Sequence, residues 1–82
     1  MYYVYLLKSK KDEKFYIGYS SDLKKRITQH KAGEVTSTSH RLPVELVYYE
    51  SYTVETLARD REMKLKQFGS AYTALLKRLH YK

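Results

Sequence analysis

Two short runs of aromatic and branched side chains, residues 2–7 and 15–19, lie near the start of the chain and are separated by the polar residues 8–14. Such runs favour extended backbone, and a short polar connection joins antiparallel neighbours. The pattern therefore predicts a β-hairpin. Because the whole chain has 82 residues, only a small core can form around it, which excludes a dinucleotide-binding domain or a large cofactor pocket.

The sequence contains no cysteine, so disulfides and thiolate metal sites are excluded and packing alone must hold the fold. A reducing cytoplasm suits this composition and is the expected location. The longest apolar run, residues 2–7, is far shorter than the ~20 residues that span a bilayer, and no cleavable leader follows it. We expect one unprocessed domain over residues 1–82 that does not contact a membrane.

Helix signals follow the hairpin. Asp22, preceded by two serines, offers an N-cap, Leu23 and Ile27 lie one turn apart, and Gly33 suits a helix end in the left-handed conformation. These signals predict a helix over about residues 22–32.

The second half of the chain contains one strand and two helices by the same criteria. Pro43 opens a strand over residues 44–49, and helical spacing indicates helices over about residues 53–68 and 71–79. Thr53 is the expected cap of the longer helix and Gly69 its stop. Its apolar stripe is expected to contain Val54, Leu57, Ala58, Leu65 and Phe68. The predicted order is strand, strand, helix, strand, helix, helix.

The formal net charge of +7 is unevenly distributed. Residues 8–31 and residues 64–82 are strongly basic, whereas residues 32–63 carry more acids than bases. One interpretation is a solvated surface that keeps the protein dissolved. The other is a polyanion partner, which the ten tyrosines favour because cations neutralise phosphates while aromatic rings stack on bases.

Two pairs of residues lie at the predicted edges of helices. Arg26 and His30 are one turn apart, which fits either an ordinary helix edge or a clamp for phosphate. In the next helix, Glu62 lies at the margin of the apolar stripe and Arg61 lies within it. Arg61 could form a structural ion pair with Glu62 or Asp60, or Glu62 could hold a Mg²⁺ ion together with waters and a substrate phosphate.

Tyr5 and Tyr16 belong to the two strands of the hairpin. A register that places them opposite each other would point both phenols to one face of the sheet and Val4, Leu6 and Ile17 to the other. Tyrosine can act as a general acid or base near a cation, although most strand tyrosines only pack. A zinc site is not expected because the three histidines are scattered, and no glycine-rich phosphate loop occurs.

Taken in order, the motifs Tyr3-Val4-Tyr5, Tyr16-Ile17-Gly18, Leu23-x-x-Arg26-x-x-x-His30 and Arg61-Glu62-x-x-Leu65-Lys66 resemble the GIY-YIG nuclease superfamily. The likeness covers almost the whole chain. It is closest to the short stand-alone bacterial subfamily, which is related to the catalytic module of excision-repair and homing endonucleases. The resemblance implies an α+β fold with a three-stranded antiparallel sheet flanked by helices. It also implies hydrolysis of DNA phosphodiester bonds with one divalent metal ion, Mg²⁺ or Mn²⁺.

The resemblance also implies roles for individual residues. Glu62 would bind the metal, Arg26 would stabilise charge on the scissile phosphate, and Tyr5 would be the base for the attacking water. Tyr16 and His30 would position water or phosphate or relay a proton. Contacts with nucleic acid are expected from Lys24, Lys25, Thr38, Ser39, Arg41 and Lys66.

The sequence departs from the family pattern at three places. Tyr3 replaces the glycine of the first motif, Tyr19 follows Gly18 where some members have lysine, and no asparagine follows the metal glutamate. Ser70, Thr73 or the segment of residues 38–39 could fill that gap.

The leading hypothesis is therefore a metal-dependent endonuclease in DNA repair or processing, with a partner protein supplying specificity. The alternatives are a nucleic-acid-binding module with weak or no catalysis, and a structural or protein-interaction role.

Overall fold

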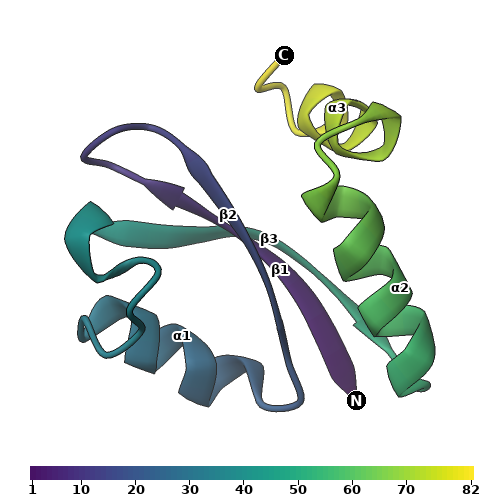
Figure 1. Cartoon of the computed structure of the whole chain (residues 1–82), viewed down its shortest axis with the longest axis horizontal. Helices are drawn as coiled ribbons and strands as arrows, with labels where there is room; N and C mark the ends of the chain where they lie inside the picture. The colour runs from purple at the N-terminus through teal and green to yellow at the C-terminus, as the bar shows by residue number, and fades with distance from the viewer.

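The computed structural model describes residues 1–82 and contains one sheet with helices on both of its faces (Figure 1). The strands are β1 (Tyr2–Ser9), β2 (Phe15–Ser20) and β3 (Val44–Tyr52), arranged antiparallel in the order β2-β1-β3. The helices are α1 (Leu23–Lys31), α2 (Glu55–Lys66) and α3 (Ser70–Arg78), and a short 3₁₀ helix η1 (Ser39–Arg41) precedes β3. The α+β class, the antiparallel sheet and the predicted element order are confirmed.

The central strand β1 is buried on both faces because its side chains alternate between two apolar clusters. Val4 and Leu6 point to the face covered by α2 and α3, where Ile17 joins them. Tyr5 and Leu7 point to the face covered by α1. The division predicted for the two faces of the hairpin is therefore correct, and Tyr5 belongs to the smaller cluster beside α1.

The register of the hairpin differs from the prediction. Tyr5 lies opposite Gly18 and Tyr16 lies opposite Leu7, so the two tyrosines share one face and are offset by two residues. The turn determines this offset, because Ser9 N–H donates to the Lys14 carbonyl oxygen at 2.9 Å and closes the connection after β1 has extended to Ser9. A shift by two residues leaves each side chain on its predicted face.

The first helix has the predicted boundaries and caps. The Asp22 carboxylate accepts a hydrogen bond from the Lys25 backbone N–H at 3.1 Å and satisfies a free donor of the first turn. Gly33 has a φ of 78°, a left-handed conformation that costs glycine little. Asp22 therefore marks the start of α1, and Gly33 follows its end.

The second helix is shorter than predicted. It begins after Val54 without a side-chain cap, so the expected cap at Thr53 is wrong. Of the predicted apolar stripe, Ala58 and Leu65 are buried, whereas Val54, Leu57 and Phe68 are exposed. The buried stripe of α2 is therefore narrow and consists of Ala58 and Leu65.

Arg61 has a different partner from the two predicted for it. Its guanidinium donates two hydrogen bonds to the carboxylate of Glu50 on β3, at 2.9 and 3.0 Å, and neither Glu62 nor Asp60 contacts it. Tyr48 and Tyr52 donate their hydroxyl protons to the same carboxylate. This network ties α2 to β3 and leaves Glu62 free of a structural bond to Arg61.

None of the helices is both long enough and apolar enough to cross a membrane.

Candidate active site

A chain of buried hydrogen bonds links the sheet, α1 and the loop before β3. The Tyr5 hydroxyl lies 2.8 Å from Nε2 of His30, and Nδ1 of His30 lies 2.8 Å from the Thr38 hydroxyl. Tyr5 is 2% exposed, and His30 and Thr38 are fully buried. The sequence predicted His30 at the edge of the core, whereas the structure places it inside.

The direction of the hydrogen bonds among Tyr5, His30 and Thr38 depends on which ring nitrogen of His30 carries the proton. The Thr38 hydroxyl lies 3.5 Å from the Val35 carbonyl oxygen, at the outer limit of a hydrogen bond. We assign the proton of His30 to Nδ1, so that the Thr38 oxygen accepts it and Nε2 is unprotonated. Tyr5 O–H then donates to Nε2. Thr38 thus selects the tautomer of His30 that can accept a proton from Tyr5.

Burial, assisted by the nearby Arg26 guanidinium, lowers the pKa of His30 to about 4. The imidazole is therefore neutral near pH 7. Burial likewise raises the pKa of the Tyr5 phenol to about 12, and the Arg26 guanidinium counteracts this because it favours the phenolate. In the substrate-free protein, Tyr5 and His30 form a neutral pair beside one cation.

Tyr16 completes a cluster of three rings. Its ring centroid lies 6.5 Å from that of Tyr5 and 5.2 Å from that of His30. Tyr16 is partly exposed, in contrast to Tyr5. The cluster therefore has a buried end at His30 and a solvent-facing end at Tyr16.

One side of α2 runs along the edge strand β2. Tyr19 donates a hydrogen bond to the Glu55 carboxylate at 2.7 Å, and the Arg59 guanidinium lies over the Tyr19 ring at 4.3 Å. About two turns further along, the Lys66 ammonium lies 6.0 Å from the centre of the Tyr16 ring. These contacts bring α2 side chains around the sheet edge toward the three rings.

Glu62 lies on this same side of α2. Its side chain is 19% exposed and its carboxylate pairs with the Lys66 ammonium at 3.1 Å. The charge of Glu62 also raises the pKa of Tyr5, which places the carboxylate within electrostatic reach of the phenol. Of the five predicted site residues, Tyr5, Tyr16 and His30 are in contact and Arg26 lies beside them, whereas Glu62 is connected to this group through Lys66, which contacts the Tyr16 ring.

The side chains at the site offer one carboxylate to a metal ion, which suits a hydrated hard cation. No group of three or more His, Cys, Asp or Glu side chains could hold a metal, so a closed protein site is absent. A single carboxylate such as Glu62 suits a hard cation that keeps several waters and shares a substrate phosphate, which is the usual protein coordination of Mg²⁺. Glu62 would hold such an ion once Lys66 is displaced from it.

Gly18 makes room for the Tyr5 phenol. A Cβ atom at this position would overlap Cζ and Oη of Tyr5, so only glycine permits the ring to lie against β2. Sequence reasoning treated Gly18 as part of a motif without this packing role. The register, once known, reveals it because Gly18 is the residue opposite Tyr5.

The cations of α1 differ from those of α2. In α2, Arg59, Arg61, Lys64 and Lys66 each pair with a carboxylate. In α1 no acid is present, and none of its cations forms an ion pair. These unpaired cations are Lys24, Lys25, Arg26 and Lys31. Unpaired cations also lie on the hairpin and in the last six residues of the chain, but the helix that carries His30 has four of them and no acid.

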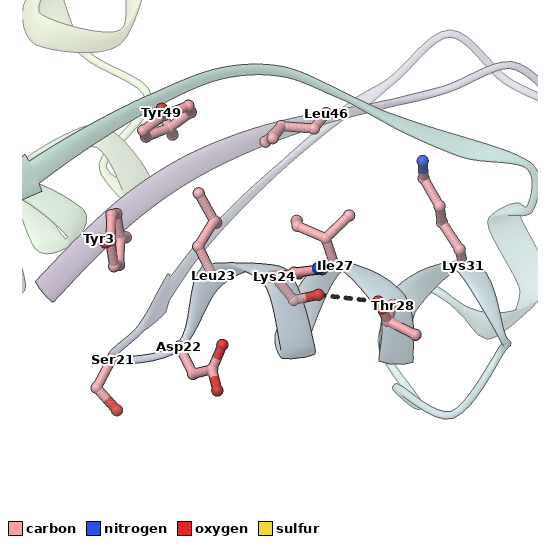
Figure 2. A pocket seen from close by; sticks show the side chains of 10 residues that line it. All are labelled: Tyr3, Ser21, Asp22, Leu23, Lys24, Ile27, Thr28, Lys31, Leu46 and Tyr49. Carbon is pink, nitrogen blue, oxygen red and sulfur yellow. Dashed lines mark hydrogen bonds between the residues drawn. The ribbon is translucent and has the colours of Figure 1, made fainter.

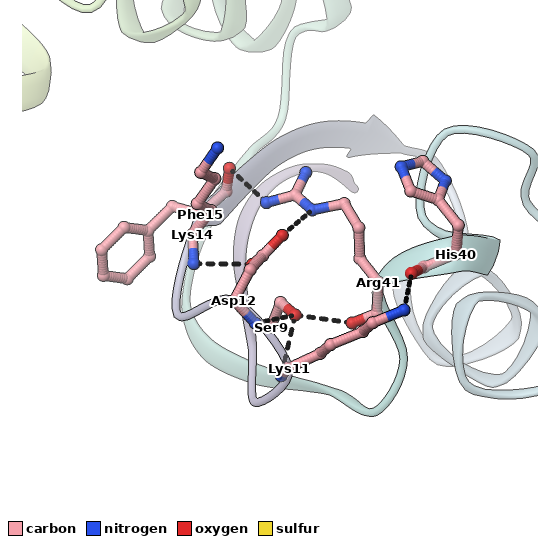
Figure 3. Close-up of polar contacts among 7 residues, drawn as sticks. All are labelled: Ser9, Lys11, Asp12, Lys14, Phe15, His40 and Arg41. Carbon is pink, nitrogen blue, oxygen red and sulfur yellow. Dashed lines mark hydrogen bonds and ion pairs between the residues drawn. The ribbon is translucent and has the colours of Figure 1, made fainter.

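Arg41 lies in a different environment from the one predicted. Figure 3 shows it packed against the hairpin turn, where it donates to the Phe15 carbonyl oxygen at 3.4 Å and pairs with Asp12 at 3.4 Å. The Ser9 hydroxyl donates to the Arg41 carbonyl oxygen at 2.6 Å and anchors the same loop. Arg41 therefore already serves a structural role.

Thr38 and Ser39 were predicted to contact nucleic acid, and the structure separates them. Thr38 is fully buried against His30, so direct contact with a nucleic acid does not fit its position. Ser39 is exposed at the start of η1. The hydrogen bond between His30 and Thr38 joins residues eight positions apart, and no helical or strand spacing predicts it, which is why the role of Thr38 beside His30 was missed.

Comparison with known proteins identifies the class to which this fold and site belong. A family model described as the GIY-YIG catalytic domain matches residues 1–74. The chain belongs to the GIY-YIG nuclease family, whose members typically use a divalent metal ion.

Individual relatives narrow this class further. A UPF0213 protein from Haloquadratum walsbyi is 37% identical over 68 residues, covering 82% of this chain and 75% of its own. A UPF0213 protein from Staphylococcus saprophyticus is 40% identical over 69 residues, covering 83% of each chain. The solution NMR structure of a UPF0213 protein from Bacillus halodurans has a TM-score of 0.59 and 31% identity, covering 96% of this chain and 85% of that one. The family resemblance predicted from the motifs is confirmed.

Proposed function

We propose that the protein is a metal-dependent endonuclease that hydrolyses phosphodiester bonds in DNA, with Mg²⁺ or Mn²⁺ held by Glu62. The observation that carries the proposal is the hydrogen-bonded chain of Tyr5, His30 and Thr38, which ends beside Tyr16 and the Arg26 guanidinium. A structural core needs no neutral phenol and imidazole aligned in this way next to an unpaired cation. We further propose that the protein acts in DNA repair or processing and that it does so in the cytoplasm.

The first chemical step is the activation of water. A water held by Tyr16 gives a proton to Tyr5 Oη while the Tyr5 hydroxyl proton moves to His30 Nε2. The hydroxide oxygen then bonds to phosphorus, and the bond from phosphorus to the leaving oxygen breaks. Solvent protonates the leaving oxygen. His30 Nδ1–H remains bonded to Thr38 throughout, so the imidazolium that forms is held in place.

Charge on the phosphate needs stabilisation by cations. Arg26 can donate two parallel hydrogen bonds to phosphate oxygens, and its present partner, Gln29 Oε1 at 3.3 Å, is a weak competitor. A divalent ion, when bound, neutralises further phosphate charge and lowers the pKa of a water bound to it. Lys24, Lys25 and Lys66 would contact the neighbouring phosphates, as the sequence predicts.

The test is nicking of supercoiled plasmid DNA in the presence of Mg²⁺ or Mn²⁺. Glu62→Gln is expected to lower the nicking rate at least about 100-fold, since the variant keeps the size of the side chain and loses the metal-binding charge. Asp60→Asn is the matched control, because Asp60 lies on the same helix and pairs only with Lys64. Equal activity of wild type and Glu62→Gln, or activity in neither, contradicts the proposal.

A second candidate function is nucleic-acid binding without hydrolysis, which the unpaired cations of α1 favour. DNA binding that weakens steeply with salt and is unchanged in Glu62→Gln, with no nicking by either protein, would select it. Under either function, we propose that a partner protein supplies sequence specificity. For the endonuclease, a change in cleavage positions on adding cell extract would reveal such a partner.

A further inference from the structure

A groove of about 570 Å³ lies between α1 and the sheet, next to the three-ring cluster, since Tyr49 in its lining is the cross-strand partner of Tyr5. Figure 2 shows Tyr3, Leu46 and Tyr49 on the sheet side and Leu23, Ile27 and Lys31 on the helix side. Of the groove residues on α1, Lys24, Thr28 and Lys31 lie about 100° or more around the helix from Arg26 and His30, whereas Leu23 and Ile27 adjoin that pair. We call this feature the α1–β3 groove.

The groove presents an accessible aromatic surface. Tyr49 is 53% exposed, which is unusual for a ring of its size on a strand. Tyr3 meets it edge-on, with ring centroids 6.1 Å apart and an interplanar angle of 62°. This contact fixes the orientation of the Tyr49 ring and leaves a face of it open. Leu23 and Ile27 form the apolar wall opposite.

The charged groups around the groove are predominantly cationic. Lys24 and Lys31 line it, and neither forms an ion pair. Asp22 is the one acid in the lining, and its carboxylate already accepts the capping hydrogen bond from the Lys25 backbone N–H. The occupant therefore has to be anionic. A second copy of this chain, with its net charge of +7, is disfavoured by repulsion.

We propose that the α1–β3 groove binds a single-stranded segment of nucleic acid, with one base stacked on Tyr49 and adjacent phosphates on Lys24 and Lys31. An open ring with flanking unpaired cations matches an unpaired base and its backbone. In a duplex the base faces are already stacked on one another, so they are not available to Tyr49. The inference rests on the proposed function and adds the form of its substrate.

The position of the groove relates it to the candidate active site. Tyr3 and Tyr5 are two residues apart on β1 and point to the same face, about 7 Å from each other along the strand. A strand bound across Tyr49 and Tyr3 would thus lie about one nucleotide from the hydrogen-bonded chain of Tyr5. This arrangement favours substrates with an unpaired region next to the scissile bond.

The experiment uses fluorescence anisotropy with a labelled ten-nucleotide oligothymidylate and a duplex of the same length. Tyr49→Ala is expected to weaken binding of the single strand by roughly 5- to 150-fold, the usual contribution of one stacked base. Tyr49→Phe keeps the ring and is expected to bind as the wild type does. Tyr81→Ala, which removes an exposed tyrosine near other lysines, is the matched control and is expected to have no effect.

Glu62→Gln separates this inference from the proposed function, because that variant is expected to bind the single strand normally even when nicking is lost. Wild-type affinity in Tyr49→Ala, or an equal loss for single strand and duplex, overturns the inference. Sedimentation of the wild type as a dimer that Tyr49→Ala dissociates also overturns it, since the occupant would then be a second copy.

Discussion

Gly18 lies so close to Tyr5 that a Cβ atom at position 18 would overlap the phenol ring. The antiparallel register places these two residues opposite each other on neighbouring strands. The glycine of the second motif is therefore a packing requirement of the tyrosine of the first. The phenol rests on β2 and points its oxygen toward His30.

Gly18→Ala is expected to displace the Tyr5 ring and to lower the free energy of unfolding by about 1–3 kcal/mol, the usual cost of overpacking a core. Urea unfolding measures the loss. Gly69→Ala is the control, because an added methyl group there meets no atom within 4 Å. The explanation is wrong if the Tyr5 and His30 resonances in NMR spectra of Gly18→Ala coincide with those of the wild type.

Thr38→Val removes the hydroxyl that accepts the proton of His30 Nδ1–H and keeps the shape of the side chain. A buried donor without a partner costs about 1–3 kcal/mol of stability. We also expect the His30 tautomer to lose its preference, which ¹⁵N NMR of the imidazole reports directly. Thr38→Ser retains the hydroxyl and should restore the wild-type tautomer. An unchanged tautomer in Thr38→Val contradicts the assigned direction of the hydrogen bonds.

The stability of the protein should depend on pH through His30. Burial lowers the pKa of this imidazole from 6.5 to about 4, so between these values the unfolded chain binds a proton that the folded protein does not. The free energy of unfolding therefore falls as the pH decreases from 6.5 toward 4, by at most about 1.4 kcal/mol per pH unit. Urea unfolding at several pH values tests this. His30→Gln should show a shallower dependence, and an equal slope in both proteins would refute the assignment.

Glu50→Gln should destabilise the protein because its carboxylate accepts hydrogen bonds from Arg61, Tyr48 and Tyr52. The pair with Arg61 is largely shielded from solvent, so we expect a loss of about 2–3 kcal/mol. Glu45→Gln provides a matched control on the same strand, since its pair with Lys10 spans 3.5 Å between half-exposed side chains. That change should cost less than about 1 kcal/mol. Similar losses in the two variants would show that the network has no special role.

Lys66→Ala frees the Glu62 carboxylate from its ion pair. If Glu62 is the metal ligand, the variant should bind Mn²⁺ more tightly than the wild type, because no ammonium has to be displaced. Paramagnetic broadening of NMR resonances around Glu62 measures this without reference to cleavage. Lys64→Ala, which frees Asp60 two residues before Glu62, is the control. Broadening centred on Asp60 in either variant would place the metal elsewhere.

The elements were predictable because each has a local signal. Asp22 and Gly33 mark the ends of α1, and the alternation of Val4, Tyr5 and Leu6 separates the two faces of β1. The register was not predictable from these signals, because a connection of seven residues allows several pairings. The hydrogen bond that closes the turn at Ser9 decides among them.

The candidate site was predictable only in part. Motif spacing predicts Tyr5, Arg26 and Glu62 as site residues, since their separations along the chain resemble those of a family, and their roles stay predictions. The partner of Arg61 was missed because helical spacing reveals neighbours within α2 and not Glu50 on β3. Thr38 was likewise interpreted as a loop residue, since nothing near it in the sequence shows that the loop folds back onto His30.

Tyr5 lies on β1, the one strand that is hydrogen-bonded along both edges and covered on both faces. Tyr5 lies in the middle of β1, so fraying of the strand ends or of a single helix would not release it. Its amide hydrogen should therefore exchange with deuterium only when the whole sheet opens, at the rate set by global unfolding. The tyrosine proposed to activate water thus belongs to the slowest-exchanging part of the molecule, and a substrate would meet a site that is already rigid.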